Sequence, residues 1–138
     1  MMTLLIAAAV FSAAGLVRVY LHRTSRKDTL HLKGCVEMTE VWNTGAAFSL
    51  PAPKALVGAL SALALLFAWR KRKEAPLWSG LLLGGGAANA YERARHKQVY
   101  DYVRFPKVPG KGKRFVWNLA DFAILLGSIG LAFCRKKR

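Results

Sequence analysis

The chain has 138 residues, of which 54% are hydrophobic, and it carries 22 lysines and arginines against 7 acidic residues. This length suits one domain over residues 1–138, and a soluble domain of this size cannot bury several long apolar runs. The net charge of +15 raises the alternative of nucleic acid. The cations cluster where apolar runs end, however, which favours anionic membrane lipid as the partner over nucleic acid.

Four apolar runs predict an all-α integral membrane protein with four transmembrane helices. Crossing the hydrocarbon takes roughly 17–25 residues. The first and last runs are long enough, whereas the two middle runs are short and need flanking basic and aromatic residues at the interfaces. The predicted helices cover approximately residues 1–20, 54–70, 76–92 and 115–134.

The first helix has one alternative, a cleaved signal peptide. Such a peptide begins with a positively charged region, and no lysine or arginine precedes Arg18. We therefore keep this segment as the first transmembrane helix.

The connections between the helices differ in character. Residues 21–53 include the strand-like stretches CVEM and EVW, which predict a small extracytoplasmic β-like segment between helices 1 and 2. Residues 92–114 contain two prolines and two glycines near their end and are predicted as loop. Within helix 3, the run GGGAA at 84–88 offers a small-residue surface that permits close helix contact.

Charge distribution gives a conflicting account of topology. The basic clusters at 70–73 and 135–138 follow helices 2 and 4, so the positive-inside rule places that side, and both termini, in the cytoplasm. Against this, residues 93–114 hold eight basic residues and residues 23–33 hold four more, all on the opposite side. We give the dense, short clusters more weight.

Polar groups in or beside a membrane are costly and tend to be functional. They gather at residues 43–49, at 89–93, at Asp101 and at 118–121. Asp121 is predicted to lie about two turns inside helix 4, where a lone carboxylate at the centre of a span costs roughly 2.5–3.5 kcal/mol. Asn118 lies three residues earlier on the same helical face and could donate a hydrogen bond to it.

If the fold brings Asp101 against Asp121, the two form a candidate aspartyl protease site. Two close carboxylates share one proton, so that one acts as base on a water and the other as acid. No spacing rule pairs them, and Asp101 taken alone is more simply interpreted as a solvated loop residue, since most such charges are exposed. Glu92 and Arg93 are equally read as interfacial salt-bridge residues.

Four motifs, in order and spacing, resemble those of the lipoprotein signal peptidase (signal peptidase II) family. They are NTGAAFS at 43–49, GGAANAYER at 85–93, VYDY at 99–102 and WNLAD at 117–121. The resemblance implies a monomeric, four-helix aspartyl endopeptidase of the bacterial cell membrane, with both termini cytoplasmic and neither cofactor nor metal. It would cut the signal peptide from diacylglyceryl-modified prolipoproteins before the lipidated cysteine.

The resemblance also assigns roles to individual residues. Asp101 and Asp121 correspond to the catalytic pair. Five polar residues correspond to groups that bind substrate or support the pair: Asn43, Asn89, Glu92, Arg93 and Asn118. The two cysteines, Cys35 and Cys134, form no pattern typical of a disulfide framework or a metal site.

This sequence departs from the family pattern at the end of helix 1. The family usually has an acidic residue there, followed four positions later by lysine, whereas this chain offers Arg18 and His22. In the third motif, Ala88 precedes Asn89, and Glu92 stands where the family has aspartate. These changes leave two alternatives open. One is a non-catalytic relative that binds lipoprotein signal peptides, and the other is a basic membrane scaffold whose carboxylates serve helix packing.

Overall fold

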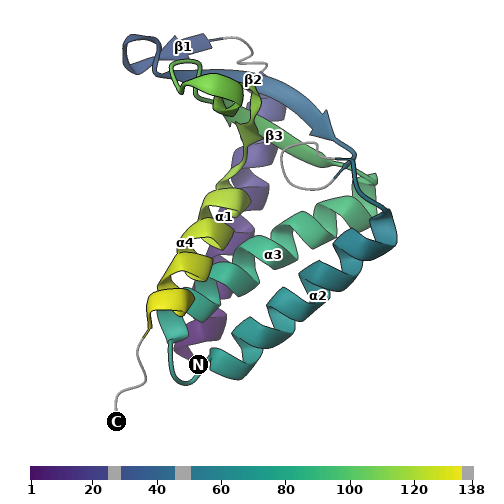
Figure 1. The fold of residues 1–138 in the computed structure, drawn as a ribbon, viewed down its shortest axis with the longest axis vertical. Coiled ribbons are helices and arrows are strands. Elements are labelled where there is room, and N and C mark those ends of the chain that lie inside the picture. The colour runs from purple at the N-terminus through teal and green to yellow at the C-terminus, as the bar shows by residue number, and fades with distance from the viewer. Residues whose placement is uncertain (25–28, 46–50, 135–138) are drawn as a thin grey trace.

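A computed structural model describes residues 1–24, 29–45 and 51–134. It consists of four helices with a small antiparallel sheet across one end of them, and the last helix ends at the other end, near the N-terminus (Figure 1). The helices are α1 (Met2–Thr24), α2 (Lys54–Lys71), α3 (Pro76–His96) and α4 (Leu119–Phe133).

The helices differ in how well they suit a bilayer. Among the described residues, α1 is the one helix that is both long and apolar enough to cross a membrane, with a mean hydropathy of 2.1, and only 6% of that apolar stretch is buried inside the protein. α4 is apolar but has 15 residues. Length and hydropathy thus identify one candidate span directly, in place of the four expected.

α3 lies between the other helices and packs closely on them, as its small residues predict. A Cβ atom on Gly84 would come within 2.6 Å of the Ala7 carbonyl oxygen of α1. One on Gly85 would come within 2.5 Å of the Ala120 carbonyl oxygen of α4. Backbone contacts this close exclude any larger side chain, so the predicted role of the small-residue run in helix packing is confirmed.

The sheet corrects the all-α prediction. Its strands are β1 (Thr29–His31), β2 (Val36–Asn43), β3 (Val99–Arg104) and β4 (Val116–Trp117). They pair in the order β1-β2-β3-β4, and every pair is antiparallel. The β-like segment between helices 1 and 2 is confirmed as β1 and β2.

The other half of the sheet was not expected. Prediction of residues 92–114 as loop is wrong for β3, because its sequence VYDYVR is rich in the β-branched and aromatic residues that favour a pleated surface. Its side chains Tyr100 and Tyr102 pack with Leu21 of α1 in a core that seats the sheet on the helix.

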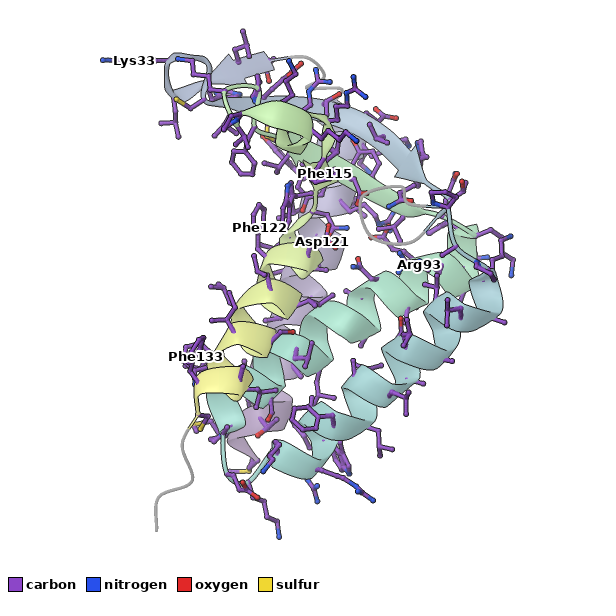
Figure 2. All side chains as sticks on the ribbon, in the orientation of Figure 1. Lys33, Arg93, Phe115, Asp121, Phe122 and Phe133 are labelled. Atoms are coloured by element: carbon purple, nitrogen blue, oxygen red, sulfur yellow. The ribbon has the colours of Figure 1, made fainter. Side chains whose placement is uncertain are left out.

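The start of helix 4 is also corrected. The apolar run from residue 115 predicts helix, but Val116 and Trp117 pair with β3 as strand β4, and α4 begins at Leu119. Asp121 therefore lies in the first turn of the helix rather than two turns inside it. Figure 2 shows Asp121 near the junction of α4 with the sheet.

Candidate active site

The first turn of α4 is fixed by side chains on both of its flanks. Asn118 is the N-cap: its Oδ1 accepts a hydrogen bond of 2.9 Å from the Asp121 N–H, while Asp121 Oδ2 accepts one of 2.9 Å from the Asn118 N–H. The next N–H, that of Leu119, donates to the Tyr102 hydroxyl of β3 at 2.9 Å. This reciprocal capping satisfies the exposed helix donors and orients the Asp121 carboxylate.

Asp101 is held on the sheet. It lies on β3 opposite Val41 of β2, and only 3% of it is exposed. Its Oδ1 accepts a hydrogen bond of 2.8 Å from Asn118 Nδ2, and its Oδ2 accepts one of 3.2 Å from Asn43 Nδ2. Burial, and then the nearby charge of Asp121, raise the pKa of Asp101 to about 7, against the lowering effect of the two amide donors.

Asn118 joins the two aspartates. Its backbone N–H donates to Asp121 and its side-chain amide donates to Asp101. The expectation that Asn118 donates a hydrogen bond to the Asp121 carboxylate is confirmed, and the donor is its backbone N–H, because as N-cap its side-chain Oδ1 accepts from the Asp121 N–H. Asp101 and Asp121 therefore both accept a hydrogen bond from Asn118, and the protease hypothesis requires that the two carboxylates meet in this way.

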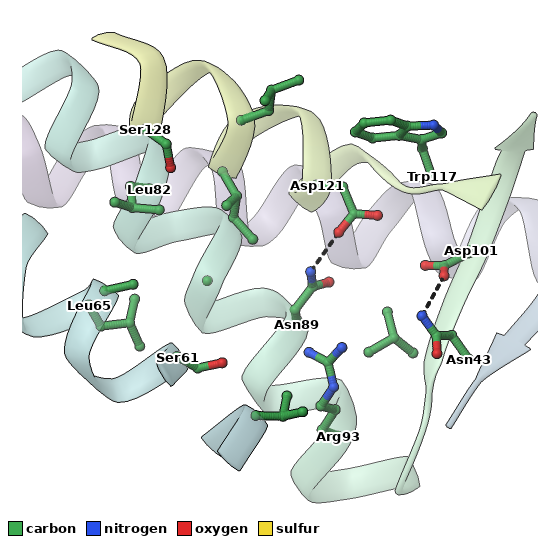
Figure 3. Close-up of a pocket in the computed structure, with 16 residues that line it drawn as sticks. Asn43, Ser61, Leu65, Leu82, Asn89, Arg93, Asp101, Trp117, Asp121 and Ser128 are labelled. Carbon is green, nitrogen blue, oxygen red and sulfur yellow. Dashed lines mark hydrogen bonds between the residues drawn. The ribbon is translucent and has the colours of Figure 1, made fainter. Parts of the chain in front are cut away.

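Asn89 of α3 completes this group. Its Nδ2 donates to Asp121 Oδ1 at 2.9 Å, and its Oδ1 accepts from Asn118 Nδ2 at 3.2 Å. Figure 3 shows Asn89 and Asp121 on one cavity, which Asn43 and Asp101 also line. We call this group of five the polar centre: Asn43, Asn89, Asp101, Asn118 and Asp121.

The polar centre opens on a cavity of about 350 Å³ with mostly apolar walls. Helices α2, α3 and α4 supply those walls, which include Leu65, Leu82 and Ile124. Two serines, Ser61 on α2 and Ser128 on α4, are polar exceptions. A second cavity of about 450 Å³ lies against α2 and α3 and shares Ser61 with the first. Both carboxylates thus line a space that is large enough for a peptide segment, and its apolar walls favour a segment with apolar side chains.

Arg93 lines both cavities. Its guanidinium nitrogen Nη2 donates to the Gly45 carbonyl oxygen at 3.4 Å, which links α3 to the residues that follow β2. The motif residues 46–49 lie outside the described part of the chain.

Glu92 and Arg18 form the contact that connects helix 1 to the site. Glu92 is buried, and its Oε2 accepts a hydrogen bond of 2.9 Å from the backbone N–H of Tyr100, the neighbour of Asp101. Its Oε1 lies 3.6 Å from Arg18 Nε. The ion-pair partner seen for Glu92 is therefore Arg18 of α1 rather than Arg93.

His22 does not join this contact. Its Nδ1 lies 3.9 Å from Glu40 Oε1 on β2, and its ring lies 5.9 Å from those of both Trp42 and Tyr100. Of the two residues that stand where the family pattern has its helix-1 pair, Arg18 faces the site and His22 supports the sheet.

Sequence reasoning missed three residues of the site. Tyr102 entered the sequence analysis only as part of the VYDY motif, yet its hydroxyl accepts a hydrogen bond from the start of α4, and burial raises its pKa to about 12. Ser61 and Ser128 line the cavity and were not singled out. Their signal was available, because polar residues are uncommon in the apolar stretches of membrane helices.

The arrangement of the two carboxylates is one that an acid–base pair would need. Among the described residues there is no cluster of three or more histidine, cysteine or acidic side chains that could hold a metal ion. Two carboxylates joined through one asparagine, on a cavity between apolar helices, are the arrangement expected of an aspartic peptidase that works at a membrane.

Comparison with known proteins agrees with this class. The family model of signal peptidase (SPase) II matches residues 3–135. The lipoprotein signal peptidase of Rhodopseudomonas palustris strain TIE-1 is 30% identical over 96% of this chain and 88% of its own length. That of Syntrophomonas wolfei is 34% identical over 86% and 78%, and that of Nitrobacter hamburgensis 36% identical over 70% and 66%.

The fold has a counterpart among solved structures. A structure described as a bacterial membrane enzyme superposes with a TM-score of 0.74, covering 99% of this chain and 93% of the other at 17% identity. The chain belongs to the signal peptidase II family of aspartic peptidases, and the resemblance seen in its four motifs is confirmed.

Proposed function

We propose that this chain is the membrane endopeptidase that removes the signal peptide from diacylglyceryl-modified prolipoproteins, just before the lipidated cysteine, with Asp101 and Asp121 as its catalytic pair. The observation that carries the proposal is the double contact of Asn118, which bonds both carboxylates at the mouth of one apolar cavity. Family membership supplies the substrate class.

The surroundings of the two carboxyl groups suggest a division of labour. Asp101 is almost fully buried and, with its pKa near 7, holds the shared proton near neutral pH. Asp121 is half-buried and lies on the cavity wall, so it is the base that takes a proton from a water molecule. The water oxygen attacks the scissile carbonyl carbon as Asp121 takes its proton, while Asp101 protonates the carbonyl oxygen. The C–N bond of the tetrahedral intermediate then breaks, Asp121 passes its proton to the leaving amine, and a hydroxyl of the intermediate returns a proton to Asp101.

The remaining polar residues act as supports. Asn43, Asn89 and Asn118 hold the carboxylates in place through amide donors, and Glu92 holds the strand that carries Asp101. Arg93, between the two cavities, is placed to bind substrate carbonyl oxygens. The apolar walls accept the hydrophobic part of the signal peptide.

The site also suggests a place in the cell. We infer that residues 1–138 form one domain in which all four helices span the bacterial cell membrane, with the sheet outside and both termini in the cytoplasm. α1 supplies the long apolar span, and the short helices α2 and α4 have exposed apolar faces that include Leu56, Leu60 and Leu126. A monomer suffices, since one chain carries both carboxylates.

Cleavage of a purified substrate tests the proposal. The chain, in detergent or nanodiscs, is incubated with a diacylglyceryl-modified prolipoprotein, and the products are identified by mass spectrometry. We expect one cut immediately before the lipidated cysteine in the wild type and none with Asp121→Asn. Binding of the substrate by both proteins, with cleavage by neither, would instead identify a non-catalytic relative.

A further inference from the structure

A group of cations overhangs the outer face of α4. Lys33 belongs to the short 3-10 helix η1 (Leu32–Gly34), and the others belong to the connection between β3 and β4, which contains the 3-10 helix η3 (Gly110–Arg114). In Figure 1 these two segments lie beside each other at one end of the sheet, beyond the helices. We call this surface the basic overhang: Lys33, Lys107, Lys111, Lys113 and Arg114.

The basic overhang is a single piece of structure. Lys107 Nζ donates to the Lys33 carbonyl oxygen at 2.6 Å, which ties the two segments together. All five cationic side chains are exposed. Because a hydrogen bond joins the two segments and all five side chains are exposed, the five charges can act together on one partner surface.

Within the described ranges of the chain, the segments that form this surface carry no acidic side chain. Residues 29–35 and 105–118 contain no aspartate or glutamate. Glu37, an acid on β2, is engaged by Arg104 through two hydrogen bonds of 2.7 and 2.8 Å. A shallow cleft of about 330 Å³ beside this pair is lined by Lys113 and Arg114, which adds two uncompensated cations to it. Such a cleft suits a phosphate group.

Between the cations and the far end of α4, the exposed side chains change from basic to aromatic and then to apolar, which is the order of headgroup, interface and hydrocarbon in a bilayer. Phe105 packs on Phe122 in the first turn of α4, with ring centroids 6.2 Å apart, and Phe122 stacks on Trp117 at 5.4 Å. Further along α4, Leu126, Ile129 and Phe133 are exposed by 53%, 47% and 82%. Figure 2 shows Phe122 and Phe133 on the same outer side of α4, with Lys33 at the far end of the sheet above them.

We propose that the basic overhang is a docking surface for anionic phospholipid headgroups, which holds the sheet down on the outer leaflet beside α4. Apolar side chains, then aromatic rings, then cations match hydrocarbon, interface and headgroup. Anionic lipid attracts basic residues near its surface, and each charge strengthens the association about fivefold. This inference does not rest on peptidase activity.

The test uses the natural cysteine of the overhang. Cys35, which is exposed beside η1, carries a fluorophore in the full chain after Cys134→Ser leaves it as the single thiol. The protein is placed in nanodiscs of phosphatidylcholine, with or without phosphatidylglycerol, that contain a quencher attached to the lipid headgroup. Quenching then reports how closely the overhang lies on the membrane.

We expect phosphatidylglycerol to increase quenching and high salt to reverse the increase. The triple variant Lys111→Gln, Lys113→Gln, Arg114→Gln should weaken the association on the order of a hundredfold and quench as in phosphatidylcholine alone. The matched control Arg70→Gln, Lys71→Gln, Lys73→Gln removes the same charge from the C-terminal end of α2 and the turn that follows it, and should behave as wild type.

Three results would overturn the proposal. The first is equal wild-type quenching in the two lipid compositions, and the second is an unchanged phosphatidylglycerol effect in the triple variant. The third is a change in fluorescence with inorganic phosphate or a soluble acidic peptide that equals the change with phosphatidylglycerol. The salt titration on wild-type protein keeps the test decisive if the triple variant does not fold.

Discussion

The two carboxylates of the polar centre are held by different parts of the molecule. Asp101 lies on a strand, is 3% exposed, and receives both of its hydrogen bonds from side-chain amides. Asp121 lies in the first turn of a helix, is half-buried, and receives one of its bonds from a backbone N–H. The comparison suggests that burial on the sheet tunes one group to keep a proton, while the helix start orients the other toward the cavity.

The polar centre thus has a strand-borne half, which carries Asp101, and a helix-borne half, which carries Asp121. Removal of either carboxylate tests whether the two halves act as a unit. We expect Asp101→Asn and Asp121→Asn each to lower kcat about 10⁴-fold, and the double variant to be no worse than either single one, because a pair that shares a proton fails when one member is lost. Initial rates of prolipoprotein cleavage measure this. Losses that multiply in the double variant would mean that the aspartates act independently.

Asn118 is the contact between the halves, and its two roles can be separated. Serine caps a helix as well as asparagine does, but it is too short to reach Asp101. Asn118→Ser should therefore lower the apparent Tm less than the loss of the cap does, and lower kcat about 10²-fold through misplacement of Asp101. Asn118→Ala, as control, should lower both. A fully active Asn118→Ser enzyme would show that the bridge is not needed.

Glu92 supports the strand-borne half alone. Glu92→Gln keeps an acceptor for the Tyr100 N–H, whereas Glu92→Ala leaves that buried donor without a partner, which costs about 1–3 kcal/mol of stability. We expect the alanine variant to lose more Tm and more activity than the glutamine variant, with activity falling about tenfold. Equal behaviour of the two variants would remove the Tyr100 contact from the account.

The raised pKa of Asp101 also predicts a pH dependence of stability. Between its ordinary pKa of 3.8 and the native pKa of about 7, the folded chain keeps a proton that the unfolded chain has lost. Stability contributed by this group therefore falls as pH rises through that window, by up to about 1.4 kcal/mol per pH unit, and then levels off. The slope of apparent Tm against pH should be shallower in Asp101→Asn, and identical slopes would contradict the shift.

The helix-borne half could largely be predicted from sequence, and the strand-borne half could not. Small residues of α3 and the spacing of Asn118 and Asp121 are local signals, although apolar Val116 and Trp117 concealed the true start of α4. The position of Asp101 depends on the pairing of β3 with β2, where Asp101 lies opposite Val41. Such a register between distant segments leaves no local trace, so only the family motifs pointed to it.

The end of helix 1 is a second place where tertiary packing, and not the local sequence, decides which residue supports the site. The sequence showed that Arg18 and His22 replace the usual pair, but it gave no means to choose between them. The choice depends on where α1 crosses α3, which places Arg18 beside Glu92 and His22 beside the sheet. Tertiary packing, rather than any spacing rule, makes Arg18 the ion-pair partner.

The pH profile of kcat/KM for the wild-type enzyme tests the central claim most directly, because it reports the ionisations of the free enzyme. If Asp101 holds the shared proton, kcat/KM should fall tenfold per pH unit above an apparent pKa of about 7, the value that burial gives this group. Activity that stays level well above that pH would contradict a proton held on Asp101, and with it the proposed division of labour between the two carboxylates.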